Sequence, residues 1–505
     1  MRPRYRRVIF GAVVLVALGG LYAGAGAIHP AAAAGKPGRP DRAAVSTATR
    51  LCPAPGSAAP TAASVAVAAM PSSSKAGRAV ITRLVPGGSP AVGPVAATDS
   101  QPGVLQVSAV KTAPRLTKSE EAGQAGSSAD VTTQDGQGGI AVSAIGSMAQ
   151  GLEVEQTGPG GLVTAQCGAP GTSFWFVGPG QATAGTIELY LMNPGSQPAD
   201  AAVTALTDIS KGPPLLGDAD NGITVPPHGM VVQSLGRLLQ SSKVIALNIT
   251  TSVGQVVAAV RESKSASQGG AWLPPTEAPA RHLVIPGLPR AGSRDLYVAV
   301  PGTASAEVKI TAVTATGSYQ PTGGTGIDLL GGSAVSIPIS SLDGVPGAIA
   351  ISASVPVTAT MEVGGGSAST PGVIAASGMP IGQQGVLADN PAHSAGSTEL
   401  VLSAPQKAAS VRIIIASSSV SALGQQGTVV QIKARSSVIL PEGPPKGAKT
   451  DAFALLVTPL SGSGPVYAGR IISSGRSVKS ILPVPASPTW ISLPVAQESL
   501  SAILG

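Results

Sequence analysis

The stretch IAISASVPVTATMEV, residues 349–363, recurs in related form three more times along this chain of 505 residues. The other copies are IAVSAIGSMAQGLEV from Ile140, IALNITTSVGQVVAAV from Ile245 and FALLVTPLSGSGPVYAG from Phe453. Their first residues lie 105, 104 and 104 positions apart. A constant period over four copies predicts that one structural unit is repeated four times.

Two further motifs repeat with nearly the same period. The first is LYLMNP from Leu189, LYVAVP from Leu296 and LVLSAP from Leu400, with a weaker copy, AVAAMP, ending at Pro71. The second is a short segment at residues 229–231, 333–335 and 436–438. The three motifs keep their order and spacing, which indicates that the repeat covers a whole domain-sized unit.

The pattern within each copy is typical of β-strands. Short runs rich in Val, Ile and Thr alternate apolar with polar residues and are separated by Gly, Pro and Ser. A sheet with one apolar face must cover that face with a second layer. About 100 residues with about seven short strands is the size of an immunoglobulin-like domain. We therefore predict an all-β fold of tandem immunoglobulin-like β-sandwich modules. The alternative is a β-propeller in which each repeat supplies two four-stranded blades.

Alanines alternate with β-branched residues in these stretches, as Ala350 does between Ile349 and Ile351. Small side chains let two sheets approach closely. We therefore expect Ala350 to be buried between the two sheets of its own module.

The N-terminal segment has the features of an export signal or membrane anchor. Residues 8–28, VIFGAVVLVALGGLYAGAGAI, are uncharged and follow an Arg-rich start. A helix of this length spans a bilayer, and the basic start favours a cytoplasmic N-terminus. We expect residues 1–34 to form a cytoplasmic start and a transmembrane anchor, which gives a single-pass membrane protein with an extracytoplasmic C-terminal region. Alternatively, cleavage near the Ala31–Ala34 run releases a secreted protein.

The remaining boundaries follow from composition and from the period. Residues 35–60 are rich in Ala and Pro and lack periodicity, which predicts an extended stalk. Four β modules are then expected at residues 61–165, 166–265, 266–366 and 367–505, and the last includes a closing C-terminal strand.

The net charge of +7 comes almost entirely from the N-terminus, where residues 1–42 hold seven basic residues and one acidic residue. Nucleic-acid binding needs Lys and Arg clustered on the folded part of a protein. We therefore expect the membrane as a partner, through residues 8–28, and no nucleic acid.

The chain has two cysteines, Cys52 and Cys167, in the similar contexts LCPAPG and QCGAPG. Two cysteines in an exported protein predict one disulfide. A redox or metal role would need a CxxC motif or a neighbouring histidine, and the sequence has neither.

Motifs for catalysis are missing from the sequence. The histidines His29, His228, His282 and His393 fall at different phases of the repeat, and there is no GxSxG, HExxH or P-loop motif. The acidic turn at residues 218–222 lacks the carboxylate that a calcium loop needs at its twelfth position. We predict no catalytic, cofactor or metal site.

The one aromatic cluster is Phe174-Trp175-Phe176. In a strand Trp175 faces away from its two neighbours, so one side of the trio belongs to the core. We expect these rings to pack between modules. The alternative is a binding surface that stacks on a glycan.

The segments CPAPG at Cys52, CGAPGTSFWFVGPG from Cys167, LYLMNPGSQPADAAVTA from Leu189 and VPPHGMVVQSL from Val225 resemble an uncharacterised family of actinobacterial exported proteins, domain of unknown function 5719. The resemblance covers most of residues 45–500, although the later copies carry Val-Pro and Ala-Pro in place of Asn-Pro. It implies an N-terminally anchored envelope protein, and it brings no catalytic residues.

These observations together predict a non-enzymatic extracytoplasmic β-repeat protein that acts as a scaffold or interaction module in the cell envelope, with envelope proteins as partners. The alternative is an accessory protein for glycan binding or glycan assembly, with cell-wall polysaccharide as its partner.

Overall fold

The computed structural model describes residues 42–53, 63–69, 77–87, 96–99, 108–112, 139–157, 164–208, 215–216, 222–236, 239, 241–263, 270–324, 326–339, 342–364, 372–391, 396–417, 420, 422, 424–444, 446 and 452–493. The expected anchor, residues 8–28, lies outside these ranges. Within them, no helix is both long and apolar enough to cross a membrane.

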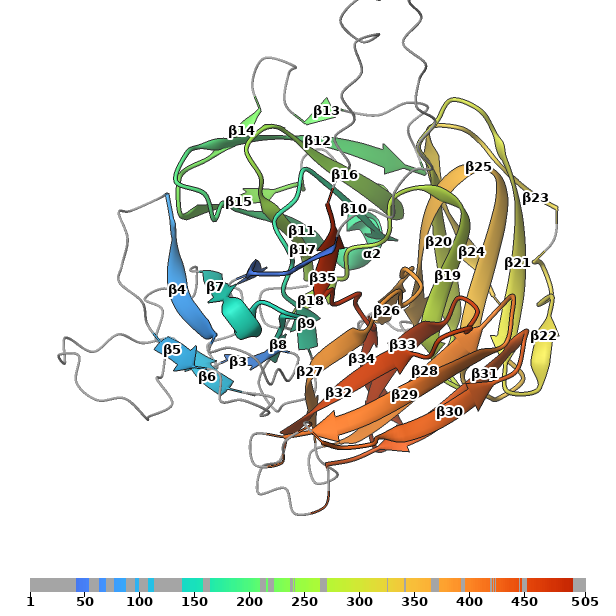
Figure 1. Cartoon of the computed structure of the whole chain (residues 1–505). Coiled ribbons are helices and arrows are strands. Elements are labelled where there is room, and N and C mark those ends of the chain that lie inside the picture. Colours follow the sequence, from blue (N-terminus) through green and yellow to red (C-terminus); the bar gives the residue numbers. More distant parts are fainter. Residues whose placement is uncertain are drawn as a thin grey trace, which may run out of the picture. The chain divides into compact units, whose positions relative to one another are not determined.

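The chain divides into two compact units, one over Ala44–Trp490 and one over Met1–Ala43 with Ile491–Gly505. In the smaller unit the structure describes only residues 42–43 and 491–493. Residues 42–43 belong to β1 (Arg42–Ala44) and residues 491–492 to β35 (Trp490–Ser492), and these two strands pair in a two-stranded sheet. The other strands lie in the larger unit and confirm the all-β prediction (Figure 1).

Four copies of one strand pattern follow each other along the larger unit, and each copy has eight strand positions. The first copy consists of β2 (Thr47–Cys52), β3 (Ala63–Ala68), β4 (Arg78–Pro86), β5 (Ala96–Asp99), β6 (Ser108–Thr112), β7 (Gly139–Ile145), β8 (Glu153–Thr157) and β9 (Thr164–Gln166). The second consists of β10 (Ser173–Pro179), β11 (Thr186–Met192), β12 (Ala199–Thr207), β13 (Leu215–Leu216) with β14 (Ile223–Val225) at the fourth position, β15 (Gly229–Ser234), β16 (Val244–Val253), β17 (Val257–Ser263) and β18 (Gly270–Leu273).

The last two copies repeat this pattern. The third consists of β19 (Ala280–Leu288), β20 (Arg294–Val300), β21 (Ala306–Thr314), β22 (Gly317–Tyr319) with β23 (Ile327–Leu329) at the fourth position, β24 (Ser333–Pro338), β25 (Gly347–Val363) at the sixth and seventh, and β26 (Val373–Ala376). The fourth consists of β27 (Gly385–Pro391), β28 (Ser397–Ala404), β29 (Ala409–Ala416), β30 (Thr428–Ile432), β31 (Ser436–Glu442), β32 (Ala452–Pro459), β33 (Tyr467–Ser474) and β34 (Ser477–Pro483). Two short helical turns, η2 (Gly146–Met148) and α2 (Gln181–Ala184), are the helical elements described.

Each copy builds two antiparallel sheets with the same strand order. Sheet I has the order first, sixth, third, fourth, as in β27-β32-β29-β30. Sheet II has the order eighth, seventh, second, fifth, as in β34-β33-β28-β31. In the third copy the long strand β25 belongs to both sheets, because it pairs with β19 and β21 near its start and with β20 and β26 near its end.

The repeated sequence motifs occupy equivalent places in these sheets. The four Ile/Phe-Ala stretches begin the sixth strands β7, β16, β25 and β32, each of which lies between the first and third strands of its copy. The LYLMNP-type motif lies on the second strands β11, β20 and β28, and the third motif on the fifth strands β15, β24 and β31. The first strand, β2, falls within residues 35–60, the segment expected to be a stalk, and its Leu51 and Cys52 are fully buried.

A core of aliphatic side chains lies between the two sheets of a copy. In the third copy Ile349 and Ile351 from sheet I pack in one cluster with Leu296 and Val298 from sheet II. The first and fourth copies have equivalent clusters. The alternating sequence explains this core, because every second residue of a strand points toward the facing sheet.

In three of the four stretches, the alanine that directly follows the first residue lies at the contact with the neighbouring copy instead. Ala454 of the fourth copy packs with Ala66 and Ala68 of the first, and Ala141 of the first packs with Tyr190 of the second. Ala350 is half-buried and packs against a cluster of Val284, Val313 and Ala348, against which Tyr467 of the next copy also packs. The expectation that Ala350 is buried within its own module was therefore wrong, because its neighbours Ile349 and Ile351 take the inward positions.

Polar contacts also join neighbouring copies. The second and first copies share a short parallel pairing of β15 with β4. Thr360 of the third copy donates from Oγ1 to the carbonyl of Val177 in the second, at 2.9 Å. Ser437 of the fourth donates from Oγ to the carbonyl of Val313 in the third, at 2.8 Å.

A buried ion pair joins the last copy to the first. Arg470 on β33 donates from Nη1 to Oε2 of Glu155 on β8 at 2.7 Å, and the two side chains are 0% and 3% exposed. The contacts between copies therefore form a closed cycle, first to second, second to third, third to fourth, and fourth back to first.

Candidate functional site

A pocket of about 550 Å³ lies where residues of all four copies meet. Its walls include residues from β9, β18, β26 and β34, the eighth strand of every copy. The eighth strand is an edge strand of sheet II in each case. The same topological position therefore contributes to the wall four times.

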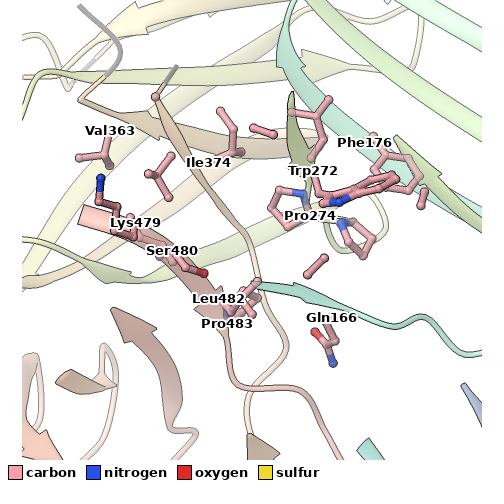
Figure 2. A pocket seen from close by; sticks show the side chains of 18 of the residues that line it. Gln166, Phe176, Trp272, Pro274, Val363, Ile374, Lys479, Ser480, Leu482 and Pro483 are labelled. Atoms are coloured by element: carbon pink, nitrogen blue, oxygen red, sulfur yellow. The ribbon is translucent and has the colours of Figure 1, made fainter. Parts of the chain in front are cut away.

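Most of the wall is apolar. Phe176 on β10, Leu273 on β18, Ile374 on β26 and Ile481 on β34 are buried and line the pocket. Figure 2 places Phe176 and Trp272 on one side of the pocket and Ile374 and Val363 on the other. The pocket thus offers an aromatic wall opposite an aliphatic one.

Trp272 is half-buried, and its ring meets that of Tyr190 edge to face, with 5.1 Å between centroids. The hydroxyl of Tyr190 donates to Oε2 of Glu188 at 2.9 Å. Burial, together with the nearby carboxylate of Glu188, raises the pKa of Tyr190 to about 12. Tyr190 therefore stays neutral at physiological pH and supports the indole as a fixed platform.

The charged residues of the wall are both basic. Arg476 and Lys479 line the pocket, and no Asp or Glu is among its described lining residues. Arg476 is exposed in the tight turn that begins β34, and Lys479 is half-buried on that strand. In the part of the chain that the structure describes, neither side chain forms an ion pair.

Lys479 occupies a β-bulge. Ile472 of β33 pairs with Ser480, and the next residue, Ser473, pairs with Val478. Lys479 is thus the extra residue between two paired positions. A bulge re-aims a side chain relative to the regular strand, and Figure 2 shows Lys479 beside Val363 at the pocket.

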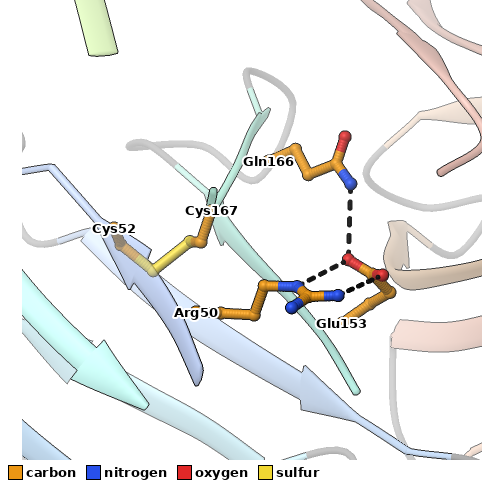
Figure 3. Close-up of a disulfide and its surroundings, with 5 residues drawn as sticks. All are labelled: Arg50, Cys52, Glu153, Gln166 and Cys167. Carbon is orange, nitrogen blue, oxygen red and sulfur yellow. Dashed lines mark hydrogen bonds and ion pairs between the residues drawn. A yellow bond between two sulfur atoms is a disulfide. The ribbon is translucent and has the colours of Figure 1, made fainter. Parts of the chain in front are cut away.

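Gln166 on β9 brings an amide to the wall, and a buried network fixes that amide. Its Nε2 donates to Oε2 of Glu153 at 3.3 Å. Glu153 also accepts hydrogen bonds from Arg50, at 3.0 Å between Nη2 and Oε1, and from Oγ of Ser487 at 3.0 Å. Figure 3 shows Arg50 and Gln166 converging on this carboxylate. With its charge satisfied by Arg50, Glu153 acts as a positioning group.

The disulfide lies next to the same wall. Cys52 at the end of β2 is bonded to Cys167 just after β9, as the sequence predicts (Figure 3). The adjacent residues Leu51 and Gly168 exchange two backbone hydrogen bonds, at 2.8 and 3.0 Å. Both line the pocket. The bond therefore fixes the first strand of the first copy to the segment that follows its eighth strand.

The three aromatic residues of the cluster identified in the sequence point to opposite faces of their strand, β10. Phe174 and Phe176 line the pocket, while Trp175, which faces the other way, is absent from the described lining. Trp175 is half-buried against the core of the second copy, and its carbonyl accepts a hydrogen bond from the amide of Thr276 at 2.9 Å.

Trp272 is the tryptophan of the pocket, and sequence reasoning missed it. It stands alone in the segment GAWLPP, with no other aromatic residue nearby in the sequence. The pairings of β18 with β17 and of β17 with β11 bring it near Tyr190.

The other candidates of the sequence do not converge. His228 lies in an exposed turn with a φ of 49°, and His282 is exposed on β19, 3.3 Å from Oγ of Ser352. His29, His393 and residues 218–221 lie outside the described residues. Among those described, no group of three or more His, Cys, Asp or Glu side chains could hold a metal ion.

A family model described as a family of unknown function, DUF5719, matches residues 119–442. The chain belongs to this family. The DUF5719 match ends with β31 and so takes in parts of all four copies, and it is shorter than the resemblance seen in the sequence. No curated protein and no solved structure matches the chain.

Proposed function

We propose that this protein is a non-enzymatic extracytoplasmic β-repeat protein, anchored in the membrane or secreted, that acts as a scaffold or interaction module in the cell envelope. The observation that carries the proposal is the central pocket. Its wall combines rings, aliphatic side chains and two cations, which are binding groups. Among the described lining residues there is no acid–base pair or activated nucleophile of the kind that catalysis uses.

We propose that each copy is a two-sheet β-sandwich and that the copies close into a propeller-like cycle. The shared core of each sheet pair supports the sandwich. The strand order departs from the immunoglobulin order, in which strands A, B, E and D share one sheet and C, F and G the other. The packing and polar contacts between successive copies support the closure.

An extracytoplasmic location is supported by the disulfide, because such bonds persist mainly in oxidising compartments. The test is protease treatment of intact cells that carry a C-terminal epitope tag. We expect the tag to be accessible from outside, and retained in washed membranes if residues 8–28 stay uncleaved. A tag protected until the cells are lysed would contradict the proposal.

Site-specific photocrosslinking in the native host tests the interaction role. A photoreactive residue at Val373, on the pocket wall, is compared with one at Lys433, which is exposed and outside the described lining. We expect a crosslinked adduct at Val373 and none at Lys433. Equal labelling of the two positions, or labelling at Lys433 alone, would contradict a role for the pocket.

A glycan-binding accessory role is the second candidate, and Trp272 is the observation that favours it. Indole rings stack on sugar faces, and this one is fixed by Tyr190. The test is binding of the protein to isolated cell-wall polysaccharide, with Trp272→Ala compared with Trp175→Ala as the matched control. Saturable binding that Trp272→Ala alone abolishes would support this role.

A further inference from the structure

We propose that the central pocket binds an amphiphile whose apolar body carries one anionic group, a phosphate or a carboxylate. This inference rests on the proposed interaction function and names the ligand class for it. Three properties of the pocket indicate this ligand class: its volume, its apolar walls and the sign of its charge.

The volume and the apolar walls define the body of the ligand. About 550 Å³ lies within the range of about 300–1,000 Å³ that is typical of small-molecule sites. Phe176, Leu273 and Ile374 are at most 4% exposed, so their positions are set by the core behind them. A chain or ring system placed here is removed from water by the aromatic side and the aliphatic side together.

The sign of the charge defines the head. Both charged lining residues, Arg476 and Lys479, are on β34 and its turn, so the positive charge is concentrated on one side of the pocket. No carboxylate of the described lining opposes it. The bulge directs Lys479 to this side, and its half-buried position reduces screening by water.

The two cations suit one phosphate or carboxylate. Arg presents a planar fork of donors and Lys a compact point charge, and both bind such oxygens by charge-assisted hydrogen bonds. The amide of Gln166, held by Glu153, adds a polar contact elsewhere on the wall. A neutral or cationic amphiphile would satisfy the apolar walls and leave the basic side unmatched.

The experiment measures Kd by calorimetry for the full chain in phosphatidylcholine nanodiscs, with empty nanodiscs as the blank. The probes are octyl phosphate, octanoate, octanol, octyltrimethylammonium and inorganic phosphate. We expect the two octyl anions to bind about tenfold more tightly than octanol, which corresponds to one charge-assisted contact. We expect inorganic phosphate and the cationic probe to bind more weakly than octanol.

Variants separate the head from the body. Lys479→Ala should reduce octyl phosphate affinity about tenfold and leave octanol unchanged, while the matched Lys433→Ala should change neither. Val373→Trp, which fills the wall of β26, should weaken both probes. An unchanged melting temperature in each variant shows that it folds.

Three results would overturn the inference: equal affinity for octyl phosphate and octanol, no effect of Lys479→Ala, or inorganic phosphate binding as tightly as octyl phosphate. If no octyl probe binds while Val373 still crosslinks to a partner in cells, the ligand class is wrong and the interaction function stands. Nanodiscs with phosphatidylglycerol identify the source. If octyl phosphate binds more weakly in these nanodiscs than in phosphatidylcholine nanodiscs, the anionic lipid competes for the pocket, which supports a membrane lipid as the natural ligand. Equal affinity in the two kinds of nanodisc supports a soluble anion.

Discussion

The most deeply buried charge among the described residues belongs to Arg470, whose guanidinium contacts Glu155 and the backbone carbonyl of Asp389. Burial raises the pKa of Glu155, and Arg470 counters that rise. A guanidinium cannot release its proton under these conditions. Glu155 therefore supplies a carboxylate that compensates the buried charge of Arg470, and the pair ties the last copy to the first.

Replacing Glu155 by Gln should lower the free energy of unfolding by about 3–5 kcal/mol, because it removes the carboxylate that contacts the buried guanidinium of Arg470. The matched control is Glu399→Gln, which breaks the pair of the half-buried Glu399 with the exposed Arg290 (3.7 Å) and should cost at most about 1 kcal/mol. Urea unfolding measures both. Equal losses would contradict a special role for the buried pair.

Glu442 at the end of β31 gives the fold a dependence on pH. Burial raises the pKa of Glu442 from 4.5 to about 7. As pH rises, the unfolded chain releases this proton before the folded protein does, so stability falls between about pH 4.5 and 7. Between about pH 5 and pH 7.5 the melting temperature of Glu442→Gln should fall less than that of the wild-type protein. The limits of this pH range carry an uncertainty of about one pH unit. The exposed Glu307→Gln should keep the wild-type slope.

At the scale of strands, the alternation of the sixth strand serves two interfaces at once. In the third copy Ile349 and Ile351 fill the core of the copy, and in the fourth copy Ala454 meets the next copy. Enlarging an alanine therefore disturbs the contact between copies while the inward residues stay in place.

Ala454→Phe should destabilise the protein by about 1–3 kcal/mol, because Ala454 is fully buried against the first copy and overpacking has this typical cost. Ala350→Phe should have a smaller effect, since Ala350 is half-buried. Urea unfolding compares the two variants. A larger loss for Ala350→Phe would contradict the assignment of these faces.

The disulfide should contribute about 4–5 kcal/mol, because it closes a loop of 115 residues in the unfolded chain. The measurement is the midpoint of urea unfolding for the double variant Cys52→Ser/Cys167→Ser. Wild-type protein under reducing conditions should unfold at the same midpoint. An unchanged midpoint in both would show that the loop is already constrained without the bond.

The sequence predicts where the strands lie far better than it predicts which strands pair with each other. Alternation in the third copy and the period of the four Ile/Phe-Ala stretches identify the strands and their equivalence. They do not say whether a strand joins sheet I or sheet II, since both sheets need the same alternation. For the same reason they could not assign Ala350 to the contact between copies.

The candidate site was harder to predict than the fold. The pairing of Cys52 with Cys167 needs no geometry, because no third cysteine competes. Trp272 and Lys479 are separated by more than 200 residues and meet only through the closed cycle of copies. The sequence of β34 does not reveal the bulge at Lys479, because no residue pattern there distinguishes a bulged strand from a regular one.

The contacts between copies should make the whole larger unit unfold as one cooperative structure. The cluster around Phe176 includes Tyr297 and Ile374 of the third copy, so no copy keeps its surroundings when a neighbour unfolds. Calorimetry of the full chain should give one transition with equal calorimetric and van't Hoff enthalpies. Two or more separated transitions would contradict this.

The eighth strands have one free edge each and differ strongly in sequence: TAQ in β9, GAWL in β18, VIAA in β26 and SVKSILP in β34. Substitutions of their half-buried side chains, such as Trp272 and Lys479, leave the buried core residues of the central strands in place. A gene built by duplication can thus acquire chemical asymmetry, an indole from one duplicate and an ammonium from another, without remodelling the framework that all four duplicates share.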